Sequence, residues 1–387
     1  MKTIAYVSAS ARVAGAEESL LQLLAALDRG RWAPVVCLPG AGPLADRLDA
    51  LDVPWFAAPV PRLRRTLNPL ALAGMSARAL RAAWTLRGEI KERGVDLVHA
   101  QGFSALAAAG PAARITGRPC LLHLRDLRYG RRVARLLCRF ADRTIAISQA
   151  VADAAPVDCT VVPNGIDADA FEARARPGEF RRELGVGDDV PLVLVAAQIV
   201  PWKGHEFFLR AFARVRAERP DALACLAGQD MFGEHEGYLR RLRELCDQLG
   251  IAESVRWLGW RDDVPTLMAD ADVLAVPSQA EPFGRVALEA MAVGTPVVGR
   301  NLGGLPEVVE DGVTGFLARP DDAAEFAELS EFAELEEFAQ LILRALTTGD
   351  DLSAAARRRV REQFSIEQHA RGVCDVYLGL CVGQGKV

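Results

Sequence analysis

The sequence over residues 192–217 reads LVLVAAQIVPWKGHEFFLRAFARVRA. Its first part, Leu192–Ala196, is a short apolar run of the kind that forms a buried β-strand. After a loop, Gly204–Ala217 carries apolar residues at helical spacing, which predicts an amphipathic helix. A buried strand followed by such a helix is the repeating unit of a parallel, doubly wound sheet.

The same alternation of strands and helices extends in both directions along the chain. Towards the N-terminus, a helix is expected over Ala16–Leu27 and strands over Thr3–Val7, Pro34–Leu38, Asp96–His99, Cys120–His123 and Thr144–Ile147. Towards the C-terminus, strands are expected over Leu223–Leu226, Val255–Leu258, Asp272–Val276 and Pro296–Val298. We therefore expect an α/β protein of two Rossmann-like doubly wound domains with a cleft between them. Ligands of such sheets bind beyond the carboxyl ends of the strands.

The chain length also favours two domains, since 387 residues is more than twice the usual size of one domain, about 150 residues. A looser stretch around Pro177 and Gly178 interrupts the alternation. We expect a first domain over residues 1–170, a linker over 171–190 and a second domain over 191–364.

Composition excludes several classes of protein. With 50% hydrophobic and 25% charged residues, extensive disorder is not expected, and the net charge of -5 argues against a general nucleic-acid-binding protein. The eight cysteines form no C-x-x-C pair, so we expect reduced cysteines and no zinc ribbon. The first apolar run is too short for a signal peptide, and no run approaches the ~20 residues of a membrane span. A cytoplasmic protein is expected.

Charge is divided unevenly along the chain. Residues 1–170 hold 22 basic and 15 acidic side chains, and the remainder holds 24 and 36. Between residues 55 and 140 the counts are 16 basic against 4 acidic, concentrated in Arg62–Arg87 and Arg125–Arg143. This basic region predicts either a solvated surface or a surface that docks on anionic lipid or an anionic acceptor. Nucleic acid is less favoured, because aromatic residues rarely interleave with the basic ones.

The helix predicted over residues 129–140 is compatible with both a solvated surface and a docking surface. Residues 129–140 place arginines near helical spacing, with apolar residues on another face. If the first alternative holds, the apolar face packs inward on the core. The arginines are Arg131, Arg132, Arg135 and Arg139, and the apolar residues are Val133, Leu136, Leu137 and Phe140.

A short internal repeat occupies residues 325–341, where the unit Glu-Phe-Ala-Glu-Leu occurs twice and is followed by a degenerate copy. The phenylalanines Phe326, Phe332 and Phe338 are six residues apart, so they do not share one helical face. We expect a local duplication in a surface helix rather than a solenoid.

The richest stretch for chemistry is Pro277–Met291, which follows an apolar strand and leads into a helix. A glycine at the start of that helix, Gly284, lets an anion approach free backbone N–H groups. Glu281 precedes the helix and Glu289 lies within it. A phosphate between them leaves Glu289 to accept from a ribose diol and Glu281 to accept from hydroxyls at the other end of a sugar nucleotide. Taken alone, this spacing is better explained by two surface or capping acids.

The ordered set of motifs resembles glycosyltransferase family 4, whose members have the GT-B fold. The family signature E-x7-E is matched from Glu281 to Glu289, and the resemblance extends from Ala14 to about Phe364. The other matching motifs are Ile147-Ser-Gln-Ala-Val151, Val162-Pro-Asn-Gly-Ile-Asp167, Trp202-Lys-Gly-His205, Gly294-Thr-Pro-Val-Val, Gly303-Gly-Leu-Pro-Glu307 and Asp311-Gly-Val-Thr-Gly-Phe-Leu317.

The resemblance implies a role for each matching position. Glu289 would bind the ribose, Glu281 the donor-sugar hydroxyls, and Lys203 the diphosphate leaving group, where glycosyl transfer builds negative charge. His123 resembles the family histidine that faces the donor sugar, so His123, Lys203 and Glu281 are the expected catalytic residues. The expected donor-binding residues are Gly15, Gln198, Lys203, Glu281, Phe283, Gly284, Arg285, Val286 and Glu289.

Some positions depart from the family or carry weaker signals. Gln198 stands where the family often has an arginine that contacts phosphate, so Lys203 carries more of the charge, or another arginine such as Arg12 or Arg125 helps. Arg261 is a candidate near the base, and Asn164 falls in the interdomain motif. His205 is expected at the surface. Beyond the second domain, the helix predicted over Ser365–Leu380 should cross back onto the first domain, so 365–387 is assigned there.

The resemblance implies a retaining enzyme without a metal or other cofactor, whose donor substrate is a nucleoside-diphosphate sugar. Asp167-Ala-Asp169 and Asp270-Ala-Asp272 fit a D-x-D pattern, but neither is expected near the diphosphate. The expected activity is transfer from a UDP- or GDP-linked sugar to a glycan, lipid-linked or small-molecule acceptor. A sugar-nucleotide epimerase and a non-catalytic sugar-nucleotide-binding protein are the alternatives. The expected location is cytoplasmic, either free or peripheral on the inner face of a membrane.

Overall fold

The computed structural model describes residues 1–63, 66, 68–127, 130–231, 233–319 and 327–382. The chain divides into two compact units. Unit 1 comprises Met1–Gly165 together with Ile366–Val387, and unit 2 comprises Ile166–Ser365. Arg64, Arg65 and Arg128 of the basic region and Phe326 of the repeat lie outside the described residues.

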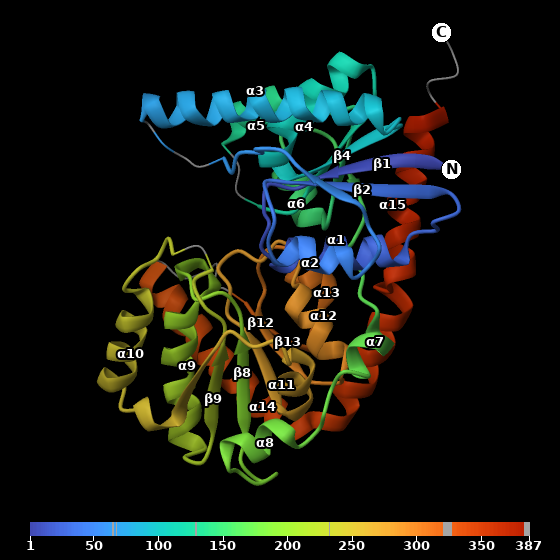
Figure 1. Cartoon of the computed structure of the whole chain (residues 1–387). Helices are drawn as coiled ribbons and strands as arrows, with labels where there is room; N and C mark the ends of the chain where they lie inside the picture. The colour runs from blue at the N-terminus through green and yellow to red at the C-terminus, as the bar shows by residue number, and fades with distance from the viewer. Residues whose placement is uncertain (64–65, 67, 128–129, 232, 320–326, 383–387) are drawn as a thin grey trace. The chain divides into compact units, whose positions relative to one another are not determined.

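Unit 1 is built on a seven-stranded sheet in the order β3-β2-β1-β4-β5-β6-β7 (Figure 1). Every neighbouring pair of strands is parallel. Strand order reverses between β1 and β4, which makes this the point where a doubly wound sheet binds its ligand. The strands are β1 (Lys2–Val7), β2 (Trp32–Leu38), β3 (Trp55–Ala57), β4 (Leu97–Gln101), β5 (Cys120–Leu124), β6 (Arg143–Ala146) and β7 (Thr160–Val161).

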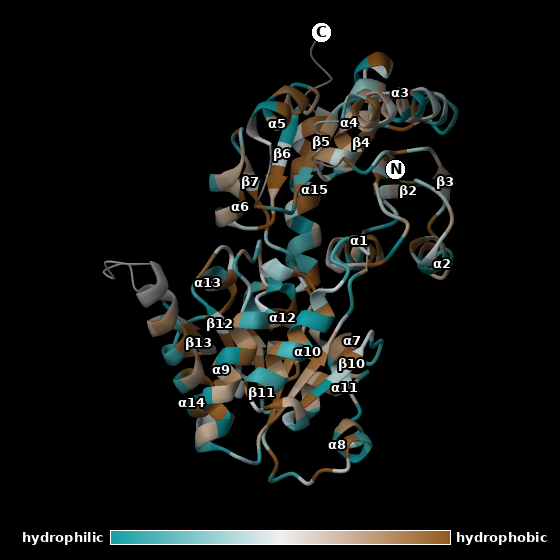
Figure 2. Ribbon diagram, turned by 90° about the vertical axis from the view of Figure 1, so that its left-hand side faces the viewer, coloured by the Kyte–Doolittle hydropathy of each residue, from teal (hydrophilic) through white to brown (hydrophobic). Residues whose placement is uncertain are grey.

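The central strands of unit 1 are buried on both faces, as a parallel sheet requires. Figure 2 shows β5 as predominantly hydrophobic, and every residue of β5 is buried. Helices α3, α4 and α5 lie on one side of the sheet in both views (Figures 1 and 2). The helices of unit 1 are α1 (Gly15–Ala26), α2 (Pro43–Asp49), α3 (Pro69–Glu92), α4 (Gly102–Thr116), α5 (Arg131–Cys138), α6 (Gln149–Ala154) and α15 (Ile366–Val382).

The last helix, α15, belongs to unit 1 although 200 residues of unit 2 separate it from the rest. It packs against α1 and β4. Val373 and Tyr377 are fully buried in the same core cluster as Ile4 and Leu121. The helix expected after residue 364 is therefore an integral part of the first sheet's core.

Unit 2 has a six-stranded parallel sheet in the order β10-β9-β8-β11-β12-β13. Its order reverses between β8 and β11. The strands are β8 (Leu192–Ala196), β9 (Leu223–Ala227), β10 (Val255–Gly259), β11 (Val273–Val276), β12 (Val297–Arg300) and β13 (Gly315–Ala318). The helices are α7 (Ala168–Glu172), α8 (Glu179–Leu184), η1 (Pro201–Lys203), α9 (His205–Glu218), α10 (Tyr238–Gln248), η2 (Ala252–Ser254), α11 (Val264–Asp270), α12 (Arg285–Ala292), α13 (Leu305–Val308) and α14 (Ala327–Gln363).

The segment expected as a linker, 171–190, is part of unit 2. It contains helix α8, which packs against α11, and the buried side chain of Phe180. Arg181 donates to the carbonyl oxygens of Gly187 and Val190 and so holds the segment in a fixed conformation. The proline and glycine that suggested a linker form a turn that enters a helix.

The described part of the repeat lies in the 37-residue helix α14, which has one exposed and one buried face there. Phe332 is 55% exposed and Phe338 is fully buried, which confirms for these two residues that they do not share one face. Glu334 is also buried and forms two hydrogen bonds with Arg300. The described part of the repeat therefore has one face in the core of unit 2.

The inward apolar face expected over residues 129–140 is wrong for two of its members. Val133 is 60% exposed and Leu136 is 56% exposed, whereas Ala134 and Cys138 are the buried side chains of α5. Residues 134 and 138 are four apart, so these two small side chains lie on the same, inner face of the helix.

Two further features concern the chain as a whole. All eight cysteines lie within the described residues, and all are free. Among the described helices, none combines the length and the apolar character that a membrane crossing requires.

Candidate functional site

The switch point of the unit 2 sheet positions the expected diphosphate-binding residues. Lys203 follows β8, and Glu281 follows β11, which is the neighbour of β8. Because parallel strands end at the same edge of a sheet, residues far apart in sequence meet there. The loop after β8 ends in the turn η1, which carries Lys203.

Two backbone features hold these loops together. The backbone N–H of Gln279 donates to the carbonyl oxygen of Trp202 over 2.9 Å. Gly204 has φ +75°, and a Cβ there would lie 1.9 Å from the carbonyl oxygen of Pro277. Only glycine permits this approach, so Gly204 brings the lysine loop against the loop that carries Glu281.

Lys203 and Glu281 form an ion pair. Lys203 Nζ donates to Glu281 Oε2 over 2.7 Å, with side-chain exposures of 23% and 9%. A charge-assisted hydrogen bond of this length is strong, and its burial reduces screening by water. The ammonium group is therefore held at the carboxyl end of β8, where it can also reach a bound anion.

Helix α12 starts directly after Gly284, which has φ +101°. Gly304 packs against this entry, since a Cβ there would lie 2.4 Å from the carbonyl oxygen of Pro282. Two glycines thus allow the chain to turn sharply into α12. The N-terminal end of a helix carries unpaired N–H groups and a partial positive charge, which suits a phosphate group.

A second ion pair lies in the first turns of α12. Arg285 Nε lies 2.9 Å from Glu289 Oε1, with side-chain exposures of 13% and 15%. The Nη1 atom of Arg285 is buried and has no hydrogen-bond partner among the described residues. An unsatisfied buried donor is costly in a protein, which makes Arg285 a candidate contact for an anion.

The remaining donor-binding candidates of unit 2 have different environments. Gln198 follows β8 by two residues, and its carbonyl oxygen accepts from the N–H of Val200. Phe283 is buried, and its ring meets that of Phe364 edge-on at 5.9 Å. Val286 is half-buried in the first turn of α12. Phe283 therefore contributes packing.

In unit 1, His123 lies at the carboxyl end of β5, beside Gln101 at the end of β4. The side chain is fully buried, and its ring stacks on that of His99 with 5.3 Å between ring centroids. Burial, the guanidinium of Arg125 and two neighbouring histidines lower the pKa of His123 well below its usual range. His123 is therefore neutral at physiological pH.

Arg125 connects four segments of unit 1. Its Nη1 donates to Ser19 Oγ (2.9 Å) and Asn164 Oδ1 (3.0 Å), and its Nε donates to Gln101 Oε1 (3.2 Å). Its Nη2 lies 3.2 Å from His123 Nδ1. The sequence singled out Arg125 only as a possible phosphate contact, yet its guanidinium joins the ends of β4 and β5 to α1 and to the loop that contains Asn164.

This contact fixes the tautomer of His123. A guanidinium can only donate hydrogen bonds, so Nδ1 of the neutral ring accepts and the ring proton is on Nε2. The Nε2 atom is buried and has no partner among the described residues. His123 thus presents a buried N–H donor, which can hydrogen-bond to an oxygen atom but cannot remove a proton from it.

His99, in β4, contacts helix α15 rather than a loop. Its Nδ1 lies 2.7 Å from the hydroxyl of Tyr377 on α15, and Tyr377 in turn donates to Tyr6 on β1. Burial lowers the pKa of His99 well below its usual range. The histidine and tyrosine side chains form a buried polar column that fixes α15 on the sheet.

Two other unit 1 candidates lie close to this network or to its helix. Asn164 is buried, and its Oδ1 accepts from Ser19 Oγ over 2.8 Å, so it orients Arg125. Gly15 is the exposed first residue of α1. Glu17, two residues further, has a pKa raised by burial, and it accepts from the N–H of Ala14.

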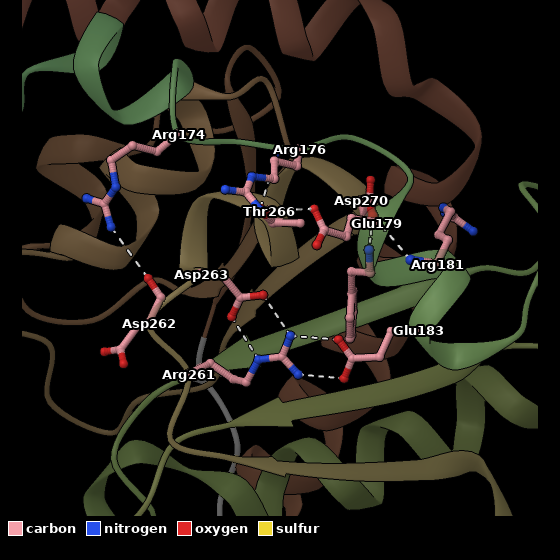
Figure 3. Close-up of polar contacts among 11 residues, drawn as sticks. Arg174, Arg176, Glu179, Arg181, Glu183, Arg261, Asp262, Asp263, Thr266 and Asp270 are labelled. Carbon is pink, nitrogen blue, oxygen red and sulfur yellow. Dashed lines mark hydrogen bonds and ion pairs between the residues drawn. The ribbon is translucent and has the colours of Figure 1, made fainter.

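Arg261 lies in an ion-pair network of unit 2 (Figure 3). Its guanidinium makes two hydrogen bonds to Glu183 of 2.6 and 2.7 Å, and two to Asp263 of 2.8 and 2.7 Å. Both edges of the planar group are thus occupied by carboxylates. Arg261 joins α8 to the loop before α11, and we remove it from the candidate nucleotide-binding residues.

The two D-x-D pairs have structural contacts. Asp167 caps α7, and Asp169 pairs with Arg361. Asp270 accepts from the backbone N–H groups of Gly178, Phe180 and Arg181, while Asp272 pairs with Arg181. Among the described residues, no group of three or more histidine, cysteine or acidic side chains is arranged to hold a metal ion.

Two family models match this chain. The model described as "Glycosyl transferases group 1" matches residues 178–347, and the model described as "Glycosyltransferase Family 4" matches residues 13–170. The first match falls on unit 2 and the second on unit 1, apart from its last five residues, 166–170.

Solved structures extend the comparison to the whole chain. Anabaena HepE in complex with UDP-glucose is similar with a TM-score of 0.80 and 26% sequence identity, covering 98% of this chain and 100% of that one. Sucrose-phosphate synthase from Thermosynechococcus elongatus has a TM-score of 0.78 at 21% identity, covering 99% of this chain and 100% of that one. The second likeness concerns the fold alone.

Curated relatives match over shorter segments. A D-inositol 3-phosphate glycosyltransferase of Streptomyces scabiei is 33% identical over 251 residues, covering 61% of this chain and 54% of the relative. An uncharacterized glycosyltransferase of Methanocaldococcus jannaschii is 38% identical over 172 residues, covering 43% of this chain and 42% of the relative. The matched part of this chain therefore spans about half of these relatives.

Proposed function

Because this chain belongs to the family 4 glycosyltransferases, we propose that it transfers a sugar from a UDP- or GDP-linked donor to a hydroxyl group of an acceptor. The observation that carries this proposal is the pairing of Lys203 with Glu281 at the switch point of unit 2, beside the N-terminus of α12. The complex of HepE with UDP-glucose supports a UDP-sugar as the first donor to test.

The donor roles follow from the charges of these groups. Lys203, the N-terminus of α12 and Arg285 bind the diphosphate, where positive charge stabilises the departing phosphate. Glu289 accepts hydrogen bonds from the ribose, and Glu281 accepts them from the donor sugar. Gly15 and His123 of unit 1 contribute to donor binding, with the Nε2–H of His123 donating to a sugar oxygen.

We assign retention of the anomeric configuration to a front-face reaction. The acceptor oxygen forms its bond to C1 on the face from which the C1–O bond to the diphosphate breaks. The acceptor proton passes to the departing phosphate oxygen, so no carboxylate nucleophile or external base is required. Positive charge from Lys203 and Arg285 takes the place of a metal ion, and the reaction needs no cofactor.

The acceptor is a glycan, a lipid-linked saccharide or a small molecule. The positive charge of the chain between residues 55 and 140, 16 basic against 4 acidic side chains, favours an encounter with an anionic surface. We therefore place the reaction in the cytoplasm, on the inner face of a membrane.

The test is release of nucleoside diphosphate from a panel of UDP- and GDP-sugars, with and without candidate acceptors. Acceptor-dependent release supports the transferase. Conversion of the donor into another sugar nucleotide without acceptor would indicate an epimerase, and binding without consumption would indicate a non-catalytic protein. NMR spectroscopy of the product then compares its anomeric configuration with that of the donor, and inversion would exclude the front-face reaction.

A further inference from the structure

The first half of helix α3 contributes no fully buried side chain. Its buried side chains start at Ala82, and every described residue from Asn68 to Arg81 is exposed or half-buried. Asn68 caps this end, accepting from the N–H groups of Leu70 and Ala71. A helix extension of about 20 Å without fully buried side chains gains little stability from packing in water.

The exposed side of this helix is apolar as well as basic. Leu70 is 81% exposed, Leu80 is 70% exposed and Trp84 is 69% exposed. Leu80 and Trp84 are four residues apart, so they are neighbours on one face. Arg87 places its guanidinium 4.7 Å from the centre of the Trp84 ring. Arg81 is exposed on the same helix.

Helices α4 and α5 add similar side chains. The two helices pack together, and α4 packs on α3. Ile115, Val133 and Leu136 are between 56% and 61% exposed. Arg132 and Arg135 are exposed on α5. We define the α3–α5 face by its exposed apolar residues Leu70, Leu72, Leu80, Trp84, Ile115, Val133 and Leu136 and its exposed arginines Arg78, Arg81, Arg114, Arg132 and Arg135.

Exposed large apolar side chains are concentrated on these three helices. Seven of the fourteen large apolar side chains that are exposed among the described residues lie on them, although the helices contain 24, 15 and 8 residues. Their sequences hold eight basic and two acidic residues. Both acids, Glu89 and Glu92, lie in the last turn of α3, away from its first half. The three helices thus expose apolar and basic side chains, and the two acids in their sequences lie at the C-terminal end of α3.

We propose that the α3–α5 face docks on the headgroup region of an anionic membrane, with Trp84 and Leu80 inserted and the arginines bound to lipid phosphates. Apolar insertion combined with basic side chains is the chemistry of interfacial helices, and tryptophan favours the interface. A second copy of the chain is disfavoured as the occupant, because two equally basic faces repel each other. This inference deepens the proposed function. The role of the α3–α5 face in presenting a lipid-linked acceptor rests on that function.

The first experiment is sedimentation of the full chain with phosphatidylcholine vesicles, with and without phosphatidylglycerol. Binding is expected only with the anionic lipid and should weaken with added salt. Each Arg→Gln change at Arg81, Arg132 or Arg135 should weaken it about fivefold. The combined change Leu80→Ala and Trp84→Ala should weaken it at least about tenfold. Equal binding to both vesicles, or unchanged binding of these variants, would overturn the proposal.

Two controls establish that vesicle binding depends on this face. Phe332→Ala removes an aromatic side chain of similar exposure, 55%, from unit 2 and should leave vesicle binding unchanged. Brominated lipid should quench the tryptophan fluorescence of the wild type, and Trp84→Phe should lose most of that quenching. A dimer that dissociates on Trp84→Ala would assign the face to a second copy instead.

The outcome is independent of transfer activity. Calorimetric titration with UDP and GDP should give wild-type affinity for all of these variants, which also shows that they are folded. Vesicle binding without nucleotide binding would support docking by the α3–α5 face and contradict the proposed function. Nucleotide binding without vesicle binding would contradict docking by this face and leave the proposed function standing.

Discussion

Lys203 and Glu281 lie 78 residues apart in sequence, yet their side chains meet over 2.7 Å at adjacent strand ends of unit 2. Glu281 is 9% exposed at its side chain, so its carboxylate depends on this lysine for compensation of its charge. Breaking such a pair leaves a buried charge without its partner, which costs more than removing both charges together.

A double-mutant cycle measures this dependence. Lys203→Met should lower the free energy of unfolding of unit 2 by about 2 kcal/mol, because Glu281 loses its ammonium partner. Adding Glu281→Gln should restore much of the loss. Urea denaturation of the four proteins gives the coupling energy, and strictly additive effects would contradict a direct ion pair. Lys2→Ala, which removes the exposed pair with Asp96, is the matched control and should change stability by less than about 1 kcal/mol.

Gly204 should not tolerate a side chain. Its φ of +75° is unfavourable for alanine. In Gly204→Ala, the new Cβ would also lie 1.9 Å from the carbonyl oxygen of Pro277. We expect this variant to lose more than about 1 kcal/mol of stability and to bind donor more weakly, because the loop that carries Lys203 is displaced. Gly233→Ala is the control: Gly233 too has a positive φ, +63°, but among the described residues no atom lies within 4 Å of a Cβ built there, its chain neighbours aside. Equal donor affinity in wild type and Gly204→Ala would disprove the positioning role.

Arg125 should control the tautomer of His123. Nitrogen-15 NMR of the histidine rings should show the His123 proton on Nε2 in the wild type, because Arg125 can only donate to Nδ1. Arg125→Met should remove this constraint and lower kcat for transfer more than it raises KM for the donor. Arg125→Lys retains one donor and should recover part of the activity. A wild-type His123 protonated at Nδ1 would refute the assignment.

Stability should decrease in mild acid. Burial lowers the pKa of His99 and His123 well below the usual 6.5, and that of His205 to about 4. The unfolded chain therefore binds more protons than the folded chain below pH 6.5. The free energy of unfolding is unaffected by these groups above that pH and falls below it, by up to about 1.4 kcal/mol per pH unit for each histidine.

Urea denaturation at a series of pH values between 8 and 5 tests this dependence. His123→Asn should reduce the slope below pH 6.5, whereas the exposed variant Phe332→Ala should keep the wild-type slope. A free energy of unfolding that stays constant between pH 6.5 and 5 would show that the buried histidines take up protons in the folded state.

Much of the fold could be predicted from the sequence, because buried parallel strands are continuous apolar runs. The strands expected from Thr3–Val7 to Pro296–Val298 all overlap observed strands. Strands β3, β7 and β13 were missed, because they contain only three, two and four residues and carry little periodic signal. His205 was expected at the surface, since a polar residue at a helix start is usually solvated, but it is fully buried beside Tyr238.

The candidate site was only partly accessible to sequence reasoning. Strand order is sufficient to bring Lys203 close to Glu281, since both follow strands at the switch point. The contacts of Arg125 with Ser19, Gln101 and Asn164 join residues from four segments, and no local pattern specifies them. The exposure of the apolar residues on α3 and α5 could not be predicted from their spacing either. An apolar stripe in a sequence does not show whether other residues cover it.

The central claim is that the cations beside Glu281 and Glu289 bind a nucleoside diphosphate, and calorimetric titration with UDP and GDP tests it most directly. We predict that the wild type binds at least one of them, that Lys203→Met weakens this binding at least about tenfold, and that Lys2→Ala leaves it unchanged. Folded Lys203→Met with wild-type affinity, or a wild type that binds neither nucleotide, would contradict the account.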